Sequence, residues 1–414
     1  MKHKEVICSR MALSLFTLFC FGTNAILGLS TPSKQDSWFA LIVGFIAFLP
    51  MAFVYARAIK LYPGRNILDV CEIVYGKVIG KFFQAMFLIF TLMLAALAMR
   101  NTYEFINIIM LRETPYLVIM MTLILMAVYL AVNGIEVLGR WSLAVFVVTI
   151  ASLLFTFLFS MENMDIDNMR PILNNDITTL LDSAFAMFSF PLAETIVFLL
   201  IIDFLDKKTS PYKFFYLGGF ISLAVLLLVF FRNRLTLGEF SDMATFPSYV
   251  ASRLIAISMY FSRVEGLITT NFIPLGFLKM SICTLAASEG FSKLFGVSHR
   301  RKLAFPVGLL VMALSGIVHE NVIQMFQFID YYRIYAFPFE VIVPLIIWIG
   351  AEVKTRFGKN SENKPGTQQE PKGEAQEQQS KDEVPEHAGS QVAEDAGEIS
   401  PSTVEADAEN SQGG

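Results

Sequence analysis

The sequence predicts an all-α integral membrane protein with about ten transmembrane helices. Hydrophobic residues make up 55% of the 414 residues and charged residues only 16%, whereas soluble domains carry roughly 45–50% and 25%. Apolar runs long enough to cross a bilayer recur along the whole chain. Two of these runs are interrupted by polar residues together with a glycine or a proline, which is typical of transporters that bind a ligand near the middle of the membrane.

The expected spans follow one another with mostly short loops between them. In chain order they cover residues 6–29, 38–57, 78–108, 116–132, 141–161, 180–205, 213–231, 262–291, 303–317 and 336–349. Residues 67–75 predict an amphipathic lead-in to the third span, and residues 248–261 an interfacial helix. Basic residues precede the first apolar run, as in a signal peptide, but no small-residue cleavage site stands out after it, so we interpret this run as a span.

Lysine and arginine are concentrated in alternate loops. Residues 57–81 and 293–302 are rich in basic side chains, whereas residues 162–176 and 239–242 are acidic or mixed. The positive-inside rule therefore predicts that both termini lie in the cytoplasm, and an even number of spans agrees with this orientation.

Two domains are expected: a ten-helix membrane domain over residues 1–357 and an acidic tail over residues 358–414. Residues 361–414 contain 13 Asp and Glu against 3 Lys, a net charge of −10, and no Leu, Phe, Tyr or Trp follows Lys359. Such a segment buries too little apolar surface to fold. We expect a disordered cytoplasmic tail; a partner-binding arm is the functional alternative.

The sixth span carries the strongest candidate site. Pro191 has no N–H to donate and clashes with the preceding turn, so it predicts a break in this helix. A broken membrane helix is tolerated only where its freed backbone groups face protein or a water-filled cavity. Glu194 follows about one turn later, and a carboxylate in mid-membrane is a functional-site hypothesis by default. Ser189 adds a hydroxyl just before the proline.

The first span has a matching interruption at Gly22, Thr23 and Asn24. Glycine lets the backbone approach a ligand closely, and an unwound helix offers free N–H groups to a carboxylate and free carbonyls to a cation. Together with Glu194, this lining suits a zwitterionic amino acid. The alternative is a simple proline kink in one span and a Thr–Asn pair that satisfies its own hydrogen bonds in the other.

Charged and hydroxyl-bearing residues also open the eighth span. Arg263 and Glu265 lie about 200° apart on a helix and therefore do not pair with each other. Glu265 is a candidate for proton coupling or gating, and Arg263 is assigned to the same group of coupling and gating residues. Thr269 is a candidate for cation binding. The alternatives are anchoring at the membrane interface and ordinary hydrogen bonding between helices.

Several function classes find no support in the sequence. No phosphate-binding loop, dinucleotide fingerprint or zinc-protease helix is present, so we expect neither an enzyme nor a bound cofactor, and no nucleic-acid binding. The cysteines are too far apart for a disulfide framework or a zinc site, and the histidines are scattered, so no metal site is expected; the cysteines are Cys8, Cys20, Cys71 and Cys283.

Several short motifs in this order resemble the spore-germination permease family, the B-type subunits of nutrient germinant receptors. They are Asp36-Ser37-Trp38, Tyr62-Pro63-Gly64, Val74-Tyr75-Gly76-Lys77, Phe190-Pro191-x-x-Glu194 and Arg263-Val264-Glu265. The resemblance covers about Lys4 to Phe357. It implies membership of the amino acid–polyamine–organocation superfamily and a LeuT-like fold, with a 5+5 inverted repeat and broken helices 1 and 6.

The resemblance also implies a function. The protein would lie in the spore inner membrane, act with an A-type membrane subunit and a C-type lipoprotein, and sense an amino acid or sugar. Carried over by position, the germinant pocket falls at residues 22–24 of the first span and at Ser189, Pro191 and Glu194 of the sixth. The long acidic tail departs from the family, whose members usually end soon after the last helix.

Three functional hypotheses follow from this reading. In the first, the protein is a receptor whose ligand shifts the balance between two conformations by binding one of them more tightly. In the second, it is a secondary transporter coupled to protons through Glu194 or Glu265. In the third, it only supports the assembly of a complex and binds nothing. The first two use one fold and one pocket, and a fold does not fix a function.

Overall fold

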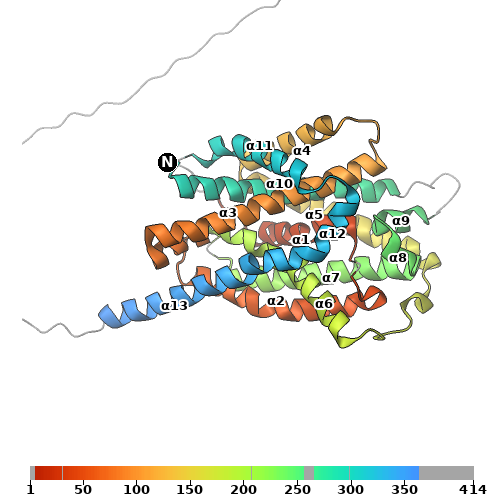
Figure 1. Ribbon diagram of the computed structural model, residues 1–414, viewed down its shortest axis with the longest axis horizontal. Helices are drawn as coiled ribbons and strands as arrows, with labels where there is room; N and C mark the ends of the chain where they lie inside the picture. The colour runs from red at the N-terminus through yellow and green to blue at the C-terminus, as the bar shows by residue number, and fades with distance from the viewer. Residues whose placement is uncertain (1–4, 30, 207, 256–264, 298, 363–414) are drawn as a thin grey trace, which may run out of the picture. The chain divides into compact units, whose positions relative to one another are not determined.

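The computed structural model describes residues 5–29, 31–206, 208–255, 265–297 and 299–362, and these residues are almost entirely helical (Figure 1). They belong to a compact unit that spans Met1–Asn363. From residue 363 onward the predicted acidic tail lies outside the described residues, while the last helix runs to Glu362, a few residues beyond the predicted domain boundary.

The bounds of the helices follow the predicted spans closely. The long helices are α1 (Ser9–Leu27), α2 (Ser37–Lys60), α3 (Ile67–Ile109), α4 (Tyr116–Asn133), α5 (Ile135–Ser160), α7 (Pro211–Leu237), α10 (Glu265–Phe295) and α11 (Arg300–Val318). Two crossings are composite: α6 (Ile177–Met187), η4 (Phe188–Leu192) and η5 (Ala193–Leu200), and α12 (Val322–Phe337), η7 (Pro338–Ile342) and α13 (Val343–Glu362). The short helices are α8 (Phe240–Met243), α9 (Pro247–Arg253), η1 (Lys34–Asp36), η2 (Met161–Asn163), η3 (Ile166–Met169) and η6 (Ile202–Phe204).

Nine helical stretches of the described residues are long and apolar enough to cross a membrane, and the shorter apolar helix Ser9–Gly22 within α1 accompanies them. This agrees with the ten expected spans. The crossings differ in how deeply they are buried. In the sixth crossing and in α10, 83% of the apolar window is buried, against 28% in α5 and α11. Helix α10 packs most extensively against α3 and also against α1, so these elements form the centre and α5 and α11 lie at the periphery.

The predicted break in the sixth crossing is confirmed. Phe190 leaves helical geometry with φ −120° and ψ 109°, and the chain passes through the π-helical segment η4 before it continues as η5. Pro191 accounts for this break because it removes a hydrogen-bond donor from the helix. The predicted lead-in to the third span is also present: α3 bends at Gly76, whose φ of 78° is readily adopted by glycine.

The predicted break at residues 22–24 is wrong, because α1 continues as one helix from Ser9 to Leu27. The side-chain amide Nδ2 of Asn24 donates to the carbonyl of Cys20 one turn earlier, at 2.9 Å. This buried polar side chain therefore finds a hydrogen-bond partner within its own helix. Gly22 serves close packing: a Cβ there would lie 3.2 Å from the carbonyl oxygen of Leu275 in α10. The helix ends instead at Gly28, whose φ is 77°. The expected interfacial helix is the shorter α9; residues 256–261 lie outside the described residues.

The segment before α1 is tied to the far end of the sixth crossing. The amide of Ile7 donates to the carbonyl of Phe204 at 2.9 Å, and the amide of Asp206 donates to the carbonyl of Ile7 at 3.0 Å. Glu5 accepts hydrogen bonds from Arg300 and Arg301 at 2.7 and 2.8 Å. Burial opposes ionisation of Glu5, but the two arginines outweigh it and lower the pKa of this carboxyl.

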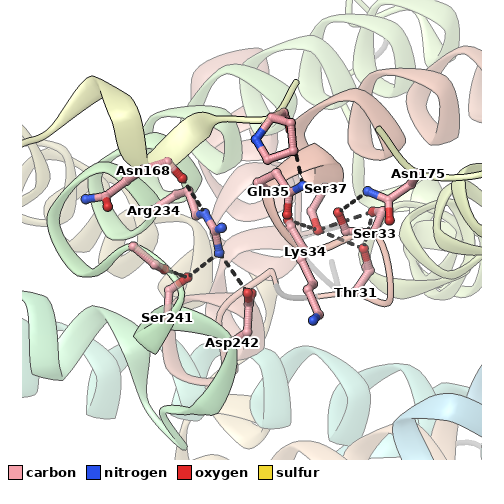
Figure 2. Close-up of polar contacts among 12 residues, drawn as sticks. Thr31, Ser33, Lys34, Gln35, Ser37, Asn168, Asn175, Arg234, Ser241 and Asp242 are labelled. Carbon is pink, nitrogen blue, oxygen red and sulfur yellow. Dashed lines mark hydrogen bonds and ion pairs between the residues drawn. The ribbon is translucent and has the colours of Figure 1, made fainter. Parts of the chain in front are cut away.

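A second network lies among the loops around α8, at the end of the unit opposite the end of α13 (Figure 1). Figure 2 shows Arg234 of α7 donating to the carboxylate of Asp242 at 2.7 Å and to the carbonyl of Asn168 at 3.0 Å. In the same view, Asn175 donates to the carbonyl of Ser33 at 3.0 Å. The loop over residues 161–176 is therefore attached both to α7 and to the segment that precedes α2.

Candidate functional site

A small cavity lies beside the break in the sixth crossing. Its volume is about 30 Å³, which holds about two water molecules. Phe190 and Glu194 of the sixth crossing and Lys279 of α10 line it, together with residues of α3, α12 and the α11–α12 loop; these are Leu94, Leu97, Ala98, Asn101, His319, Met325, Phe328, Ile329 and Tyr332. Four crossings that are distant in sequence thus meet at one polar centre within an apolar core.

A buried ion pair dominates this cavity. The Lys279 ammonium donates to Oε2 of Glu194 at 2.6 Å, and both side chains are only 1% exposed. The ammonium also lies 5.1 Å from the ring centroid of Phe19 and 5.2 Å from that of Phe190, a cation–π arrangement that stabilises a desolvated cation. Oε1 of Glu194 has no hydrogen-bond partner among the described residues, so the carboxylate keeps one acceptor free for a ligand.

A second buried carboxylate, Glu340, lies in the π-helical segment η7 of the last crossing. It accepts a hydrogen bond from the Ser189 hydroxyl at 2.7 Å, and its backbone carbonyl accepts one from the Tyr55 hydroxyl at 2.5 Å. The π-helical segments of the sixth and last crossings are thus joined directly. The Tyr332 hydroxyl lies beside Glu194 and has no hydrogen-bond partner among the described residues.

His319 completes the polar lining from the loop between α11 and α12. Burial, and secondarily the positive charge of Arg100, lower the pKa of His319 to about 4. Its imidazole is therefore neutral at physiological pH, and its Nε2 atom has no hydrogen-bond partner among the described residues.

A larger vestibule of about 530 Å³ lies next to the cavity. Phe190, Ile329 and Tyr332 line both spaces and therefore form the partition between them. The rings of Phe190 and Tyr332 meet edge to face, with centroids 5.8 Å apart. Asn24 and residues of α9 and the segment after α8 line the vestibule. A ligand that enters from the vestibule must displace this partition.

The structure places the predicted pocket residues at different distances from the cavity. Glu194 lines it, whereas Ser189 and Pro191 are buried one turn away, with Ser189 bonded to Glu340. Asn24 faces the vestibule, and Gly22 packs on α10. The side chain of Thr23 lies outside the described residues.

The predicted coupling residues lie apart from this centre. Arg263 is outside the described residues, and Glu265 is described only as the first residue of α10. Thr269 lines another hollow, between α10, the end of α3 and α9. Among the described residues, no cluster of three or more histidine, cysteine or acidic side chains forms a metal site.

Sequence reasoning missed Lys279, Glu340 and Tyr332. The first two had a usable signal, because each is a lone charge inside an apolar membrane run, the same signal that identified Glu194. Tyr332 had none, since a tyrosine near the end of a span more often marks the membrane interface.

Comparisons with known proteins identify similar chains. The family described as "Spore germination protein" matches residues 6–323. Spore germination protein KB of Bacillus subtilis (strain 168) is 22% identical over 365 residues, which cover 87% of this chain and 98% of that protein. Spore germination protein A2 of the same organism is 24% identical over 330 residues, 78% of this chain and 88% of that protein.

Among solved structures, the crystal structure of MhsT in complex with L-phenylalanine superposes with a TM-score of 0.60 and 12% sequence identity. The match covers 83% of this chain and 89% of that one. A likeness at this identity concerns the fold, and it shows that the LeuT-like architecture expected from the sequence is correct.

Proposed function

Because this chain belongs to the spore germination protein family, we propose that it is the membrane-embedded B-type subunit of a nutrient germinant receptor. In this role it binds a small nutrient in a transporter-like pocket and so triggers spore germination. The observation that carries the proposal is the buried Glu194–Lys279 pair, which lines a cavity where the sixth crossing is broken.

The charges of this pair favour a zwitterionic amino acid as the ligand. Its ammonium would bind Glu194, and its carboxylate would bind Lys279. Insertion would replace one buried ion pair by two, so that no charge is left uncompensated. A neutral sugar separates the same two charges without replacing either, and an uncompensated buried charge is costly. The pocket therefore discriminates by charge before it discriminates by size.

Binding requires a change of conformation, because a cavity that holds about two water molecules is too small for an amino acid. The ligand would push aside the partition formed by Phe190, Ile329 and Tyr332 and enlarge the cavity at the expense of the vestibule. It shifts the equilibrium toward this enlarged form only as far as it binds that form more tightly. The shift is the signal that the protein passes to its partners.

The remaining parts of the proposal follow the family. The partners are an A-type membrane subunit and a C-type lipoprotein, the location is the spore inner membrane, and both termini face the cytoplasm. The membrane domain ends near residue 357, and the acidic tail extends into the cytoplasm. The pocket residues are Gly22, Thr23, Asn24, Ser189, Pro191 and Glu194, with Arg263, Glu265 and Thr269 in gating or coupling; Lys279 joins this set.

The test is the dose response of spores that carry Glu194→Gln. We expect the response to amino acids to be lost or shifted to much higher concentration, while the variant still accumulates in the spore membrane. Glu162→Gln, at an exposed position in the loop before the sixth crossing, is the control and should germinate like the parent. A parental dose response in Glu194→Gln would exclude this carboxylate from the pocket.

A further inference from the structure

Arg232, near the end of α7, is a buried cation that has no carboxylate partner among the described residues. Its side chain is among the largest that are fully buried, at 1% exposure. The other buried cationic side chains of the described residues all face a carboxylate: Arg100 faces Glu104, Arg234 faces Asp242 and Lys279 faces Glu194. A buried charge is normally paired with an opposite charge, so Arg232 departs from the pattern of its own protein.

The neighbours of Arg232 satisfy only part of its guanidinium. Nε and Nη2 donate to Oδ1 of Asn233 at 3.1 and 2.7 Å, and Nη1 donates to the Thr156 hydroxyl at 3.0 Å. A guanidinium carries five N–H groups, and three are used here, so two remain. Both acceptors are neutral, so within the described part of the chain the positive charge of Arg232 has no counter-charge.

A cavity of about 20 Å³ lies against this guanidinium. It has room for one monatomic ion or about one water molecule. Its polar lining consists of Arg232, Thr149, Ser248 and Asn271. All four are buried, with exposed fractions of 1% for Arg232, 2% for Thr149 and Ser248, and 6% for Asn271. The apolar part of the wall comes from Phe21, Leu153, Val229 and Phe272. No carboxylate lies among these lining residues.

Several groups around the cavity can donate hydrogen bonds into it. The Thr149 hydroxyl is buried and has no partner among the described residues. The Ser248 oxygen already accepts from Asn233 at 3.0 Å, which leaves the hydroxyl hydrogen of Ser248 to donate. Asn271 uses one N–H of its amide on the carbonyl of Leu267 at 2.8 Å and keeps the other. Donors around an uncompensated guanidinium form a lining that favours an anion.

We propose that this cavity binds chloride, or another monatomic halide, between α1, α5, α7, α9 and α10. The ion supplies the counter-charge that Arg232 lacks and accepts hydrogen bonds from the Thr149 and Ser248 hydroxyls. Larger anions, including the carboxylate of a nutrient, exceed the volume of the cavity. The site is separate from the ion pair of Glu194 and Lys279, which has its own cavity.

The experiment is thermal unfolding of the purified full-length protein in detergent, in sodium chloride and in sodium gluconate at equal ionic strength. Because a ligand that binds only the folded state raises Tm by mass action, we expect a saturable rise of Tm with chloride and bromide but none with gluconate. An equal Tm in chloride and gluconate at every concentration would overturn the proposal.

Variants locate the response. In Arg232→Gln the chloride-dependent rise of Tm should disappear, whereas Arg234→Gln, which lacks only the arginine already paired with Asp242, should retain it at a lower baseline Tm. Thr149→Val keeps the volume and charge but removes one donor, and should need about tenfold more chloride for half-saturation. If Arg232→Gln does not fold, an unchanged half-saturation in Thr149→Val would refute the site.

Discussion

The ammonium of Lys279 in α10 lies 2.6 Å from the carboxylate of Glu194 in the sixth crossing, and neither side chain is accessible to solvent beyond 1%. Glu194 and Lys279 are 85 residues apart in sequence, and their contact joins the sixth crossing to α10. It lies where the sixth crossing leaves helical geometry, so any rearrangement of that break must carry one of the two charges with it.

Removing one member of this pair should destabilise the protein strongly. Lys279→Met leaves Glu194 buried without a counter-charge, which costs about 3–5 kcal/mol. The double variant Lys279→Met with Glu194→Gln should recover much of this loss, while the germinant response stays absent. Equilibrium unfolding in SDS would measure the cycle. Arg170→Gln, which breaks an exposed pair with Asp167, should cost less than about 1 kcal/mol; strictly additive single effects would argue against the coupling.

Shortening the partition should widen the range of ligands. In Phe190→Ala the wall between cavity and vestibule loses its ring, so amino acids with bulkier side chains should trigger germination at lower concentrations than in the parent. The dose response to a series of amino acids of increasing size measures this change. Phe185→Ala, which removes a ring that stacks on Phe188 and lines neither space, is the control. An identical ligand series in Phe190→Ala would show that the ring does not limit access.

Helix α2 should not tolerate a side chain at Gly44. A Cβ there would lie 2.8 Å from the carbonyl oxygen of Ala184 and 2.9 Å from the backbone nitrogen of Phe188, so α2 must move away from the broken crossing. Gly44→Ala should therefore lower stability by about 1–3 kcal/mol. At Gly266 a Cβ meets nothing within 4 Å, and Gly266→Ala should leave Tm unchanged or raise it, because alanine favours the helix. Equal effects of both substitutions would contradict the close contact.

Stability should fall in mild acid because of His319. Its pKa is about 4 in the folded protein and about 6.5 in an unfolded chain, so between these values only the unfolded state binds the proton. The free energy of unfolding therefore decreases as the pH falls from about 6.5 to 4, by about 3 kcal/mol in total. Tm measured against pH should show this decrease, and His319→Gln should remove that part of it. A variant profile parallel to the parent's would show that another group is responsible.

Reconstituted protein should not accumulate its ligand. A receptor that occludes a nutrient and passes on a conformational change has no need to release it on the other side. In liposomes with a proton gradient we expect binding of an amino acid but little uptake. Robust uptake that depends on the gradient would favour the transporter instead.

The sequence predicted the number of crossings, the break in the sixth crossing and the position of Glu194 inside that crossing, because apolar length, proline chemistry and a lone carboxylate are local signals. It failed at Gly22, since a glycine that opens a helix and a glycine that lets two helices touch have the same local pattern. It could not pair Glu194 with Lys279 or Ser189 with Glu340, because these partners are set by how distant crossings pack.

The two backbone hydrogen bonds that join Ile7 to Phe204 and Asp206 have a mechanical consequence. They fasten the segment before α1 to the end of the sixth crossing, so a displacement of either segment is transmitted directly to the other. In the proposed receptor, a change at the break beside Phe190 would therefore reach the residues before α1 through backbone hydrogen bonds rather than through side-chain contacts alone.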